Sequence, residues 1–201
     1  MQDRRLIGYS IAASALAAGS AGAEIQNVET FIIEGTETST PDMFVLSGTI
    51  DLTGNGTDNF SIFGLFDYAN DRGYASLSPI SGNYVAREPF GGGYVVSAFS
   101  PGDTIDGDLS FGGFTTLFER DYFNLDEDYE AFLNQRGFAG LRLSGDTGNS
   151  LFACLDFQVI VRGGGFSAEI RSGLINTESG EAVTCPDFAD AILIDRFEEA
   201  D

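Results

Sequence analysis

Short runs of alternating apolar and polar residues follow one another along most of the chain, with Gly, Asn and Asp turns between them. In the run FSIFGLF, Phe60, Ile62 and Phe66 fall on one face of an extended segment, whereas Phe63 and Leu65 fall on the other. This two-residue period is typical of β-strands. The sequence predicts strands over residues 29–34, 43–52, 60–68, 74–77, 83–87, 94–99, 138–143, 150–162 and 166–175.

One stretch has a helical period instead. In NLDEDYEAFLNQRG, the apolar residues Tyr129, Phe132 and Leu133 recur at helical spacing, and Gly137 supplies a stop. Asp126 is a suitable N-cap, and the acidic residues that follow it favour the positive end of a helix dipole. We therefore expect one short helix near residues 126–135.

These elements together indicate the fold class. Many short strands with one short helix are expected to bury their apolar faces by stacking two antiparallel sheets. The sequence thus predicts an all-β fold, an antiparallel β-sandwich with a jelly-roll-like arrangement, as a single domain over residues 24–185. The acidic C-terminal tail, residues 186–201, fits a last edge strand, a short helix or a docking segment.

The N-terminus has the pattern of an export signal. Arg4 and Arg5 precede a small-residue apolar stretch, and Ala21-Gly22-Ala23 matches an A-x-A cleavage site. Residues 1–23 are therefore interpreted as a Sec-type signal peptide cut after Ala23, which predicts a secreted or periplasmic protein with no membrane span after cleavage. The alternative is an N-terminal helix of the mature fold.

The chain has two cysteines, Cys154 and Cys185. An oxidising compartment would allow them to form a disulfide, and closing a loop of about thirty residues would stabilise the fold by roughly 3–4 kcal/mol in the chain-entropy model. The alternative is a pair of free, buried thiols.

Composition excludes several kinds of chemistry. The chain has no His, no Lys and no Trp, and its formal net charge is −21. Triads that use imidazole, His-ligated metals, Schiff bases and a phosphate-binding P-loop lysine all require residues that are missing. A field of this sign repels nucleic acid and attracts cations or basic partners, so we expect no nucleic-acid partner.

The segment DLTGNGTDNF, residues 51–60, raises the question of calcium binding. Oxygen-bearing side chains recur at alternate positions, with Gly56 where a sharp turn needs glycine. A weak Ca²⁺ loop would use Asp51, Thr53, Asn55, Thr57 and Asp58. The alternative is a polar turn between two strands, in which Asn, Asp and Gly satisfy local hydrogen bonds.

Three further groups of residues could carry a function. A second cation candidate is the acidic group Asp121, Asp126, Glu127, Asp128 and Glu130, whose alternative is a solvated helix start. Sugar binding would use exposed aromatic residues, for which Tyr68, Tyr74, Tyr84 and Tyr94 are available, although core packing is the commoner fate of such residues. A pair of carboxylates across a cleft would indicate a glycoside hydrolase.

Two segments resemble a loose group of exported, β-rich bacterial proteins of unknown function, the PEP-CTERM-type secreted proteins. The segment DLTGNGTDNFSIF resembles the D-x-D-G-x-G-x-D-D-F opening of that group, and GFAGLRL, residues 137–143, resembles a later G-[YF]-x-G-L-[RK]-[FL] strand. The group's H-Y-G-W motif is replaced here by Leu151-Phe152-Ala153-Cys154, and its sorting tail is missing. The resemblance implies a secreted β-sandwich and supplies no catalytic residues.

These observations lead to one expected function and two alternatives. We expect an exported, non-enzymatic β-sandwich protein with a structural, adhesive or extracellular-matrix role, because imidazole and amine chemistry are missing and sandwiches commonly serve as scaffolds. Its partner would be a polysaccharide or another cell-surface component. The first alternative is a carbohydrate- or calcium-binding module, with Ca²⁺ as the one cofactor considered. The second is a carboxylate-based hydrolase.

Overall fold

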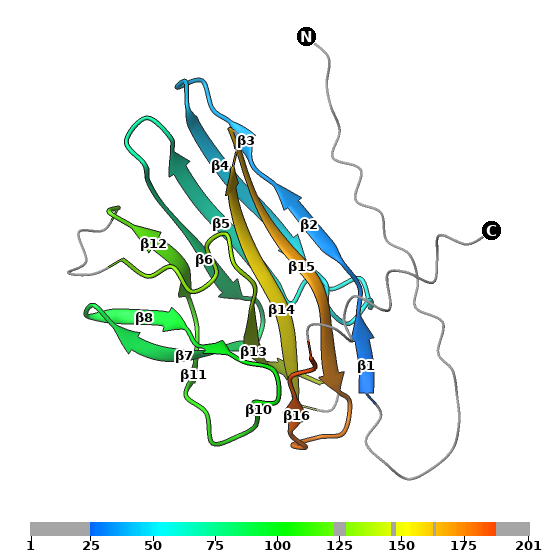
Figure 1. Ribbon diagram of the computed structural model, residues 1–201. Helices are drawn as coiled ribbons and strands as arrows, with labels where there is room; N and C mark the ends of the chain where they lie inside the picture. Colours follow the sequence, from blue (N-terminus) through cyan, green and yellow to red (C-terminus); the bar gives the residue numbers. More distant parts are fainter. Residues whose placement is uncertain (1–24, 123–127, 146–147, 163, 188–201) are drawn as a thin grey trace.

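A computed structural model describes residues 25–122, 128–145, 148–162 and 164–187, and the described part of the chain consists of strands and their connections (Figure 1). The strands are β1 (Ile25–Val28), β2 (Phe31–Glu34), β3 (Thr36–Glu37), β4 (Met43–Ile50), β5 (Phe60–Asp67), β6 (Arg72–Pro79), β7 (Tyr84–Phe90), β8 (Gly93–Val96), β9 (Ala98–Phe99), β10 (Thr104–Ile105), β11 (Phe111–Gly112), β12 (Thr115–Arg120), β13 (Gly137–Ser144), β14 (Ser150–Arg162), β15 (Gly165–Asn176) and β16 (Val183–Thr184).

The strands form one curled sheet that folds back on itself to make two layers. Its order is β1-β15-β14-β13-β7-β8-β12-β6-β5-β4-β3, and β2, β9 and β11 pair with β15, β13 and β7. Almost every pairing is antiparallel; β8 and β12 are parallel. Figure 1 shows β2, β14 and β15 in front of the layer that contains β4, β5 and β6. The expected all-β sandwich is confirmed.

The chain passes between the layers several times, and two of these places show how the layers are joined. In β7, Val85 pairs with Leu141 of β13, whereas residues from Arg87 onward pair with β8 of the other layer. At Gly35 the chain leaves β2, which pairs with β15, and enters β3, which pairs with β4. The Gly35 amide donates a hydrogen bond of 2.6 Å to the Phe166 carbonyl at this crossing.

The main core lies between the two layers. Alternation along β5 places Phe60, Ile62 and Phe66 inside, each about 1 % exposed. The rings of Phe66 and Phe118 lie 6.1 Å from the ring of Phe166, which comes from the facing layer. Burying large apolar side chains from both inner faces is the dominant stabilising contribution in such a sandwich.

A smaller core covers the outer face of β13 and β14. Ile105 and Val183 of the short β10–β16 ladder are buried there against Phe138 and Phe152 of the sheet. A disulfide joins Cys154 in the middle of β14 to Cys185, with an S–S distance of 2.02 Å and a Cα–Cα distance of 5.4 Å. This bond holds the covering segment against the sheet.

The helix expected near residues 126–135 is not formed in its described part, residues 128–135. Tyr129 instead makes an antiparallel bridge to Glu119, and Leu133 makes a parallel bridge to Val159. The segment, which we call the strap, therefore links β12 of one layer to β14 of the other, and its own Phe132 is fully buried. Burial against two strands of the sheet outweighed the local helical pattern.

Several expectations concern parts of the chain that lie outside the described residues. These are the signal peptide with its cleavage site after Ala23, the start of the expected helix, and nearly all of the tail 186–201. Within the described residues, no helix is long and apolar enough to cross a membrane.

Candidate functional site

The loop proposed for calcium is organised around the carboxylate of Asp51. One oxygen accepts hydrogen bonds from the amides of Thr53 and Gly54, at 3.1 and 2.9 Å, and from the Thr53 hydroxyl. The other oxygen accepts the Gly56 amide at 2.6 Å. Four donors from the loop itself thus surround the charge that a cation would need, which is the arrangement of a self-capped polar turn.

The other side chains of the loop either accept hydrogen bonds from backbone amides or are exposed to solvent. The Asn55 side chain accepts the Thr57 amide at 2.8 Å, and Asn59 accepts the Leu52 amide at 2.7 Å. Thr57 and Asp58 are exposed. No group of three or more acidic or cysteine side chains converges as metal ligands anywhere in the described residues.

The second acidic group is divided among different partners. The Asp128 carboxylate accepts the Asp121 amide at 3.0 Å, and Glu130 pairs with Arg120. Asp126 and Glu127 lie outside the described residues. The described members of this group therefore hold the strap in place.

The four tyrosines considered for sugar binding do not line a common groove. Tyr68 donates a hydrogen bond to the Gly165 carbonyl at one end of the sandwich. Tyr74 lies on the outer face of β6 and packs 4.7 Å from the ring of Tyr122. Tyr84 and Tyr94 each lie beneath an arginine.

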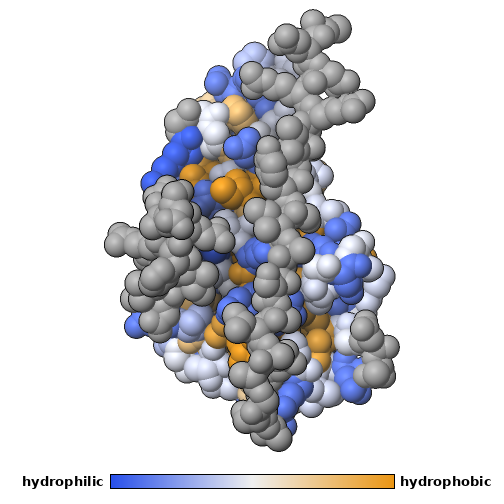
Figure 2. Space-filling view, turned by 90° about the vertical axis from the view of Figure 1, so that its right-hand side faces the viewer, coloured by the Kyte–Doolittle hydropathy of each residue, from blue (hydrophilic) through white to orange (hydrophobic). Residues whose placement is uncertain are grey.

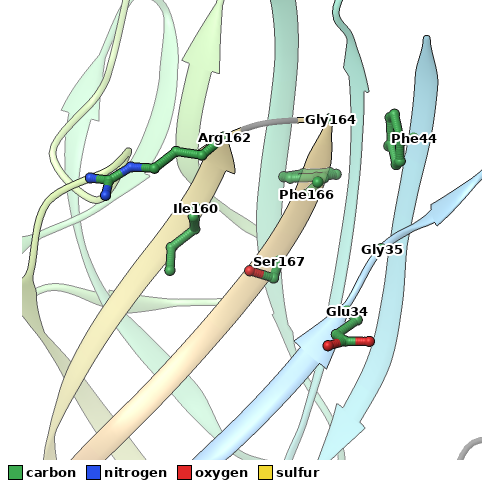
Figure 3. A pocket seen from close by; sticks show the side chains of 9 residues that line it. Glu34, Gly35, Phe44, Ile160, Arg162, Gly164, Phe166 and Ser167 are labelled. Atoms are coloured by element: carbon green, nitrogen blue, oxygen red, sulfur yellow. The ribbon is translucent and has the colours of Figure 1, made fainter.

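A shallow cleft of about 280 Å³ opens where the chain crosses between the layers (Figure 3). Phe44, Ile160 and Phe166 supply apolar walls, and Glu34 and Arg162 supply opposite charges. The Arg162 side chain extends away from Glu34 (Figure 3). Glu34 is the one carboxylate among the described lining residues, whereas glycoside hydrolysis uses a pair.

A different surface stands out by its lack of charge. Alternation along β4, β5 and β6 turns a set of polar and apolar side chains to the outside of their layer, and Thr116 of β12 continues it. We call this surface the neutral face; it consists of Val45, Ser47, Thr49, Ser61, Phe63, Leu65, Tyr74, Ser76, Ser78 and Thr116. None of these positions holds Asp, Glu or Arg.

The neutral face contains a row that runs straight across four strands. Ser47 pairs with Phe63, Phe63 with Ser76, and Ser76 with Thr116. The exposed Ser47 therefore lies on one side of the Phe63 side chain, which is 44 % exposed. Ser76 on the other side is fully buried, and its hydroxyl donates a hydrogen bond to the Phe63 carbonyl. Charged residues border the face: Asp67 and Arg72 form an ion pair of 3.3 Å at the strand ends, and Glu119, which is paired with Tyr74, is buried at about 1 % exposure.

Aromatic rings gather beside this row. The ring of Phe63 lies 6.1 Å from that of Tyr74, which in turn packs against Tyr122. Burial raises the pKa of Tyr74 above its usual value, so its hydroxyl stays protonated and uncharged at neutral pH. The face thus combines a flat apolar patch with neutral hydroxyl groups.

Sequence reasoning missed this surface because it followed the inward positions of each strand. The outward positions of β4, β5 and β6 alternate just as regularly. Examining them for charged residues would have shown that the positions of the neutral face hold no Asp, Glu or Arg. Tyr122 follows β12, and the sequence contains no signal that it would stack on Tyr74.

Comparisons of the chain with protein-family models, with curated proteins and with solved structures gave no match. Its function is therefore inferred from its own surfaces. Viewed from the right-hand side of Figure 1, hydrophobic residues form separate patches among hydrophilic ones (Figure 2).

Proposed function

We propose that this is an exported, non-enzymatic adhesive or matrix protein that contacts neutral polysaccharide through the neutral face. The observation that carries the proposal is that the ten positions of the neutral face hold no Asp, Glu or Arg, although the chain has a net charge of −21. Removing a charged side chain from water costs free energy unless it gains an oppositely charged partner. A neutral polysaccharide has no such charge, so an uncharged protein surface binds it without that cost.

The chemistry of the face suits a neutral sugar polymer. The exposed ring of Phe63 offers a flat apolar contact for the C–H groups of a sugar ring. Exposed hydroxyls of Ser47 and Thr49 beside it can donate and accept hydrogen bonds with sugar hydroxyls. A flat sheet face also fits an extended polymer better than a small molecule, which binds in concave sites.

Two other observations support a non-enzymatic, exported protein. The absence of His and Lys removes the commonest general bases and amine nucleophiles. The disulfide between Cys154 and Cys185 suits an oxidising compartment such as the periplasm or the exterior of the cell.

The proposal is tested by depletion of the mature protein from solution by insoluble neutral polysaccharides, for example cellulose, chitin and curdlan. We expect binding to at least one of them, and about tenfold weaker binding by Phe63→Ser and by Ser47→Asp. Both substitutions lie at exposed positions, so the fold should be retained.

Ile32→Ser is the matched control, because Ile32 is 59 % exposed on the outer face of the opposite layer. It should bind like the unchanged protein, and binding should be nearly constant between low and high salt. Failure to bind any neutral polysaccharide, or equal binding by Phe63→Ser, would refute the proposal.

A further inference from the structure

The opposite layer carries a positively charged side chain in an unusual setting. Arg142 lies on β13 between Leu141 and Leu143, both buried in the core, so its own side chain is on the outer face. Its guanidinium carbon lies 4.4 Å from the centre of the Tyr84 ring and 5.2 Å from that of Phe111.

Three strands fix this arrangement. Arg142 is paired directly with Tyr84 of β7 in the ladder, and Phe111 of β11 is paired with Ala86 on the other side of β7. The Phe111 ring also packs 5.9 Å from that of Phe152, which belongs to the smaller core. The guanidinium is therefore held by parts of the fold that are themselves anchored.

Arg142 also lacks the partner that most arginines here have. Arg72, Arg120, Arg136 and Arg171 each form an ion pair with a carboxylate. No carboxylate of the described residues lies within ion-pairing distance of Arg142, although the chain has 31 acidic residues. Aromatic contacts occupy the faces of a guanidinium, while its N–H donors lie in the plane and remain available.

We propose that Arg142, with Tyr84 and Phe111, binds the carboxylate of an acidic sugar, as in a uronate-containing polysaccharide. A planar, pre-oriented guanidinium matches a carboxylate by two parallel hydrogen bonds. Tyr84 is 37 % exposed, so part of its ring and its hydroxyl can contact the sugar that carries the carboxylate. This site is distinct from the neutral face and lies on the other side of the sandwich.

An acidic peptide is the other obvious ligand for an arginine, but it fits less well. Its side chains place carboxylates on flexible stems, whereas a uronate carries its carboxylate on a rigid ring that can lie against an aromatic side chain.

The test is a calorimetric or NMR titration of the mature protein at physiological salt with methyl glucuronide, with methyl glucoside and with a triglutamate peptide. The two glycosides differ only at C6, which is a carboxylate in the glucuronide and a CH2OH group in the glucoside. We expect millimolar binding of the glucuronide, about tenfold tighter than that of the glucoside and of the peptide.

Variants locate the site. Arg142→Gln should weaken glucuronide binding about tenfold. Arg142→Lys should give an intermediate loss, because lysine keeps the positive charge but lacks the planar pair of N–H donors of the guanidinium. Arg171→Gln is the control, because that guanidinium already pairs with Glu169 at 2.9 Å, and it should bind normally. Circular dichroism identifies any variant that has lost its fold, and Arg142→Lys retains most of the apolar stem that packs there.

The outcomes are decisive in either direction. Equal affinity for glucuronide and glucoside, unchanged binding by Arg142→Gln, or tighter binding of triglutamate would overturn the inference. Phe63→Ser should leave glucuronide binding unchanged, so this site can fail or succeed independently of the neutral face.

Discussion

At the scale of single residues, local partners decide what each acidic or basic side chain does. Asp51 organises its own loop through four donors, whereas Asp156 is fully buried and pairs with Arg136. From the sequence, a polar turn could be predicted as one of two alternatives for the loop of residues 51–60, because the hydrogen bonds of an Asx turn join residues that are close in sequence. It could not identify Arg142, because the rings that hold it come from β7 and β11.

Gly35 provides a test at this scale. A Cβ atom there would lie 2.5 Å from the Phe166 carbonyl oxygen, which is backbone and cannot rotate away. We expect Gly35→Ala to lower the free energy of unfolding by about 1–3 kcal/mol, because overpacking at this crossing must shift β15 or β2. Urea denaturation measures the change.

Gly113→Ala is the matched control for Gly35. A Cβ at Gly113 meets no atom within 4 Å, and the residue does not have a left-handed backbone. Its stability should change by less than about 0.5 kcal/mol. Equal effects of the two substitutions would show that the crossing is not constrained as described.

At the scale of elements, alternation predicted most of the long strands because their inner and outer faces differ in the sequence itself. It missed β1, β12 and the two-residue strands β3, β10, β11 and β16, whereas β9 falls within the predicted strand 94–99. Strands of two residues are too short to show a period. The helical reading of residues 126–135 was wrong for the described part because Tyr129 and Leu133 found bridge partners in β12 and β14. Such partners are distant in sequence and leave no local pattern.

The strap can be tested through Tyr129, whose hydroxyl donates a hydrogen bond to the Val96 carbonyl. Burial, with a smaller contribution from the charge of Glu88, raises the pKa of this tyrosine well above its usual value near 10. The stabilisation is therefore fully present below about pH 10 and is lost as the pH rises through the higher folded-state pKa. Tyr129→Phe should cost about 1 kcal/mol at pH 7 and should flatten the decline in stability above pH 10.

Chemical denaturation of both proteins at pH 7 and at pH 11 provides the measurement. Tyr94→Phe is the comparison, because Tyr94 is 47 % exposed and should alter neither value appreciably. A Tyr129→Phe variant that declines as steeply as the unchanged protein would exclude Tyr129 as a source of alkaline sensitivity.

At the scale of the whole molecule, a net charge of −21 opposes the compact state. The all-β class could be predicted because it depends on many local patterns that agree. The strand order could not, because the sharing of β7 between the layers depends on which distant segments meet. The same holds for the two outer faces, whose chemistry appears only when strands are placed side by side.

Charge repulsion gives a prediction for the intact protein. Raising NaCl from about 0.02 M to 0.5 M shortens the Debye length from roughly 20 Å to about 4 Å, so the melting temperature should rise by several degrees. Differential scanning calorimetry measures this rise. Glu37→Gln removes one exposed charge and should stabilise slightly at low salt but not at high salt. A melting temperature that falls with salt would contradict the argument.

The disulfide has a mechanical consequence. Cys154 lies in the thirteen-residue strand β14, which pairs with β13 over residues 150–157 and with β15 over residues 152–162. Tension applied to the chain beyond Cys185 would pass through a covalent bond into this central strand, and not into the two-residue ladder of β16. The force would then have to break many backbone hydrogen bonds together. Pulled from that side, the protein would resist unfolding far better than its secondary structure near residue 185 suggests.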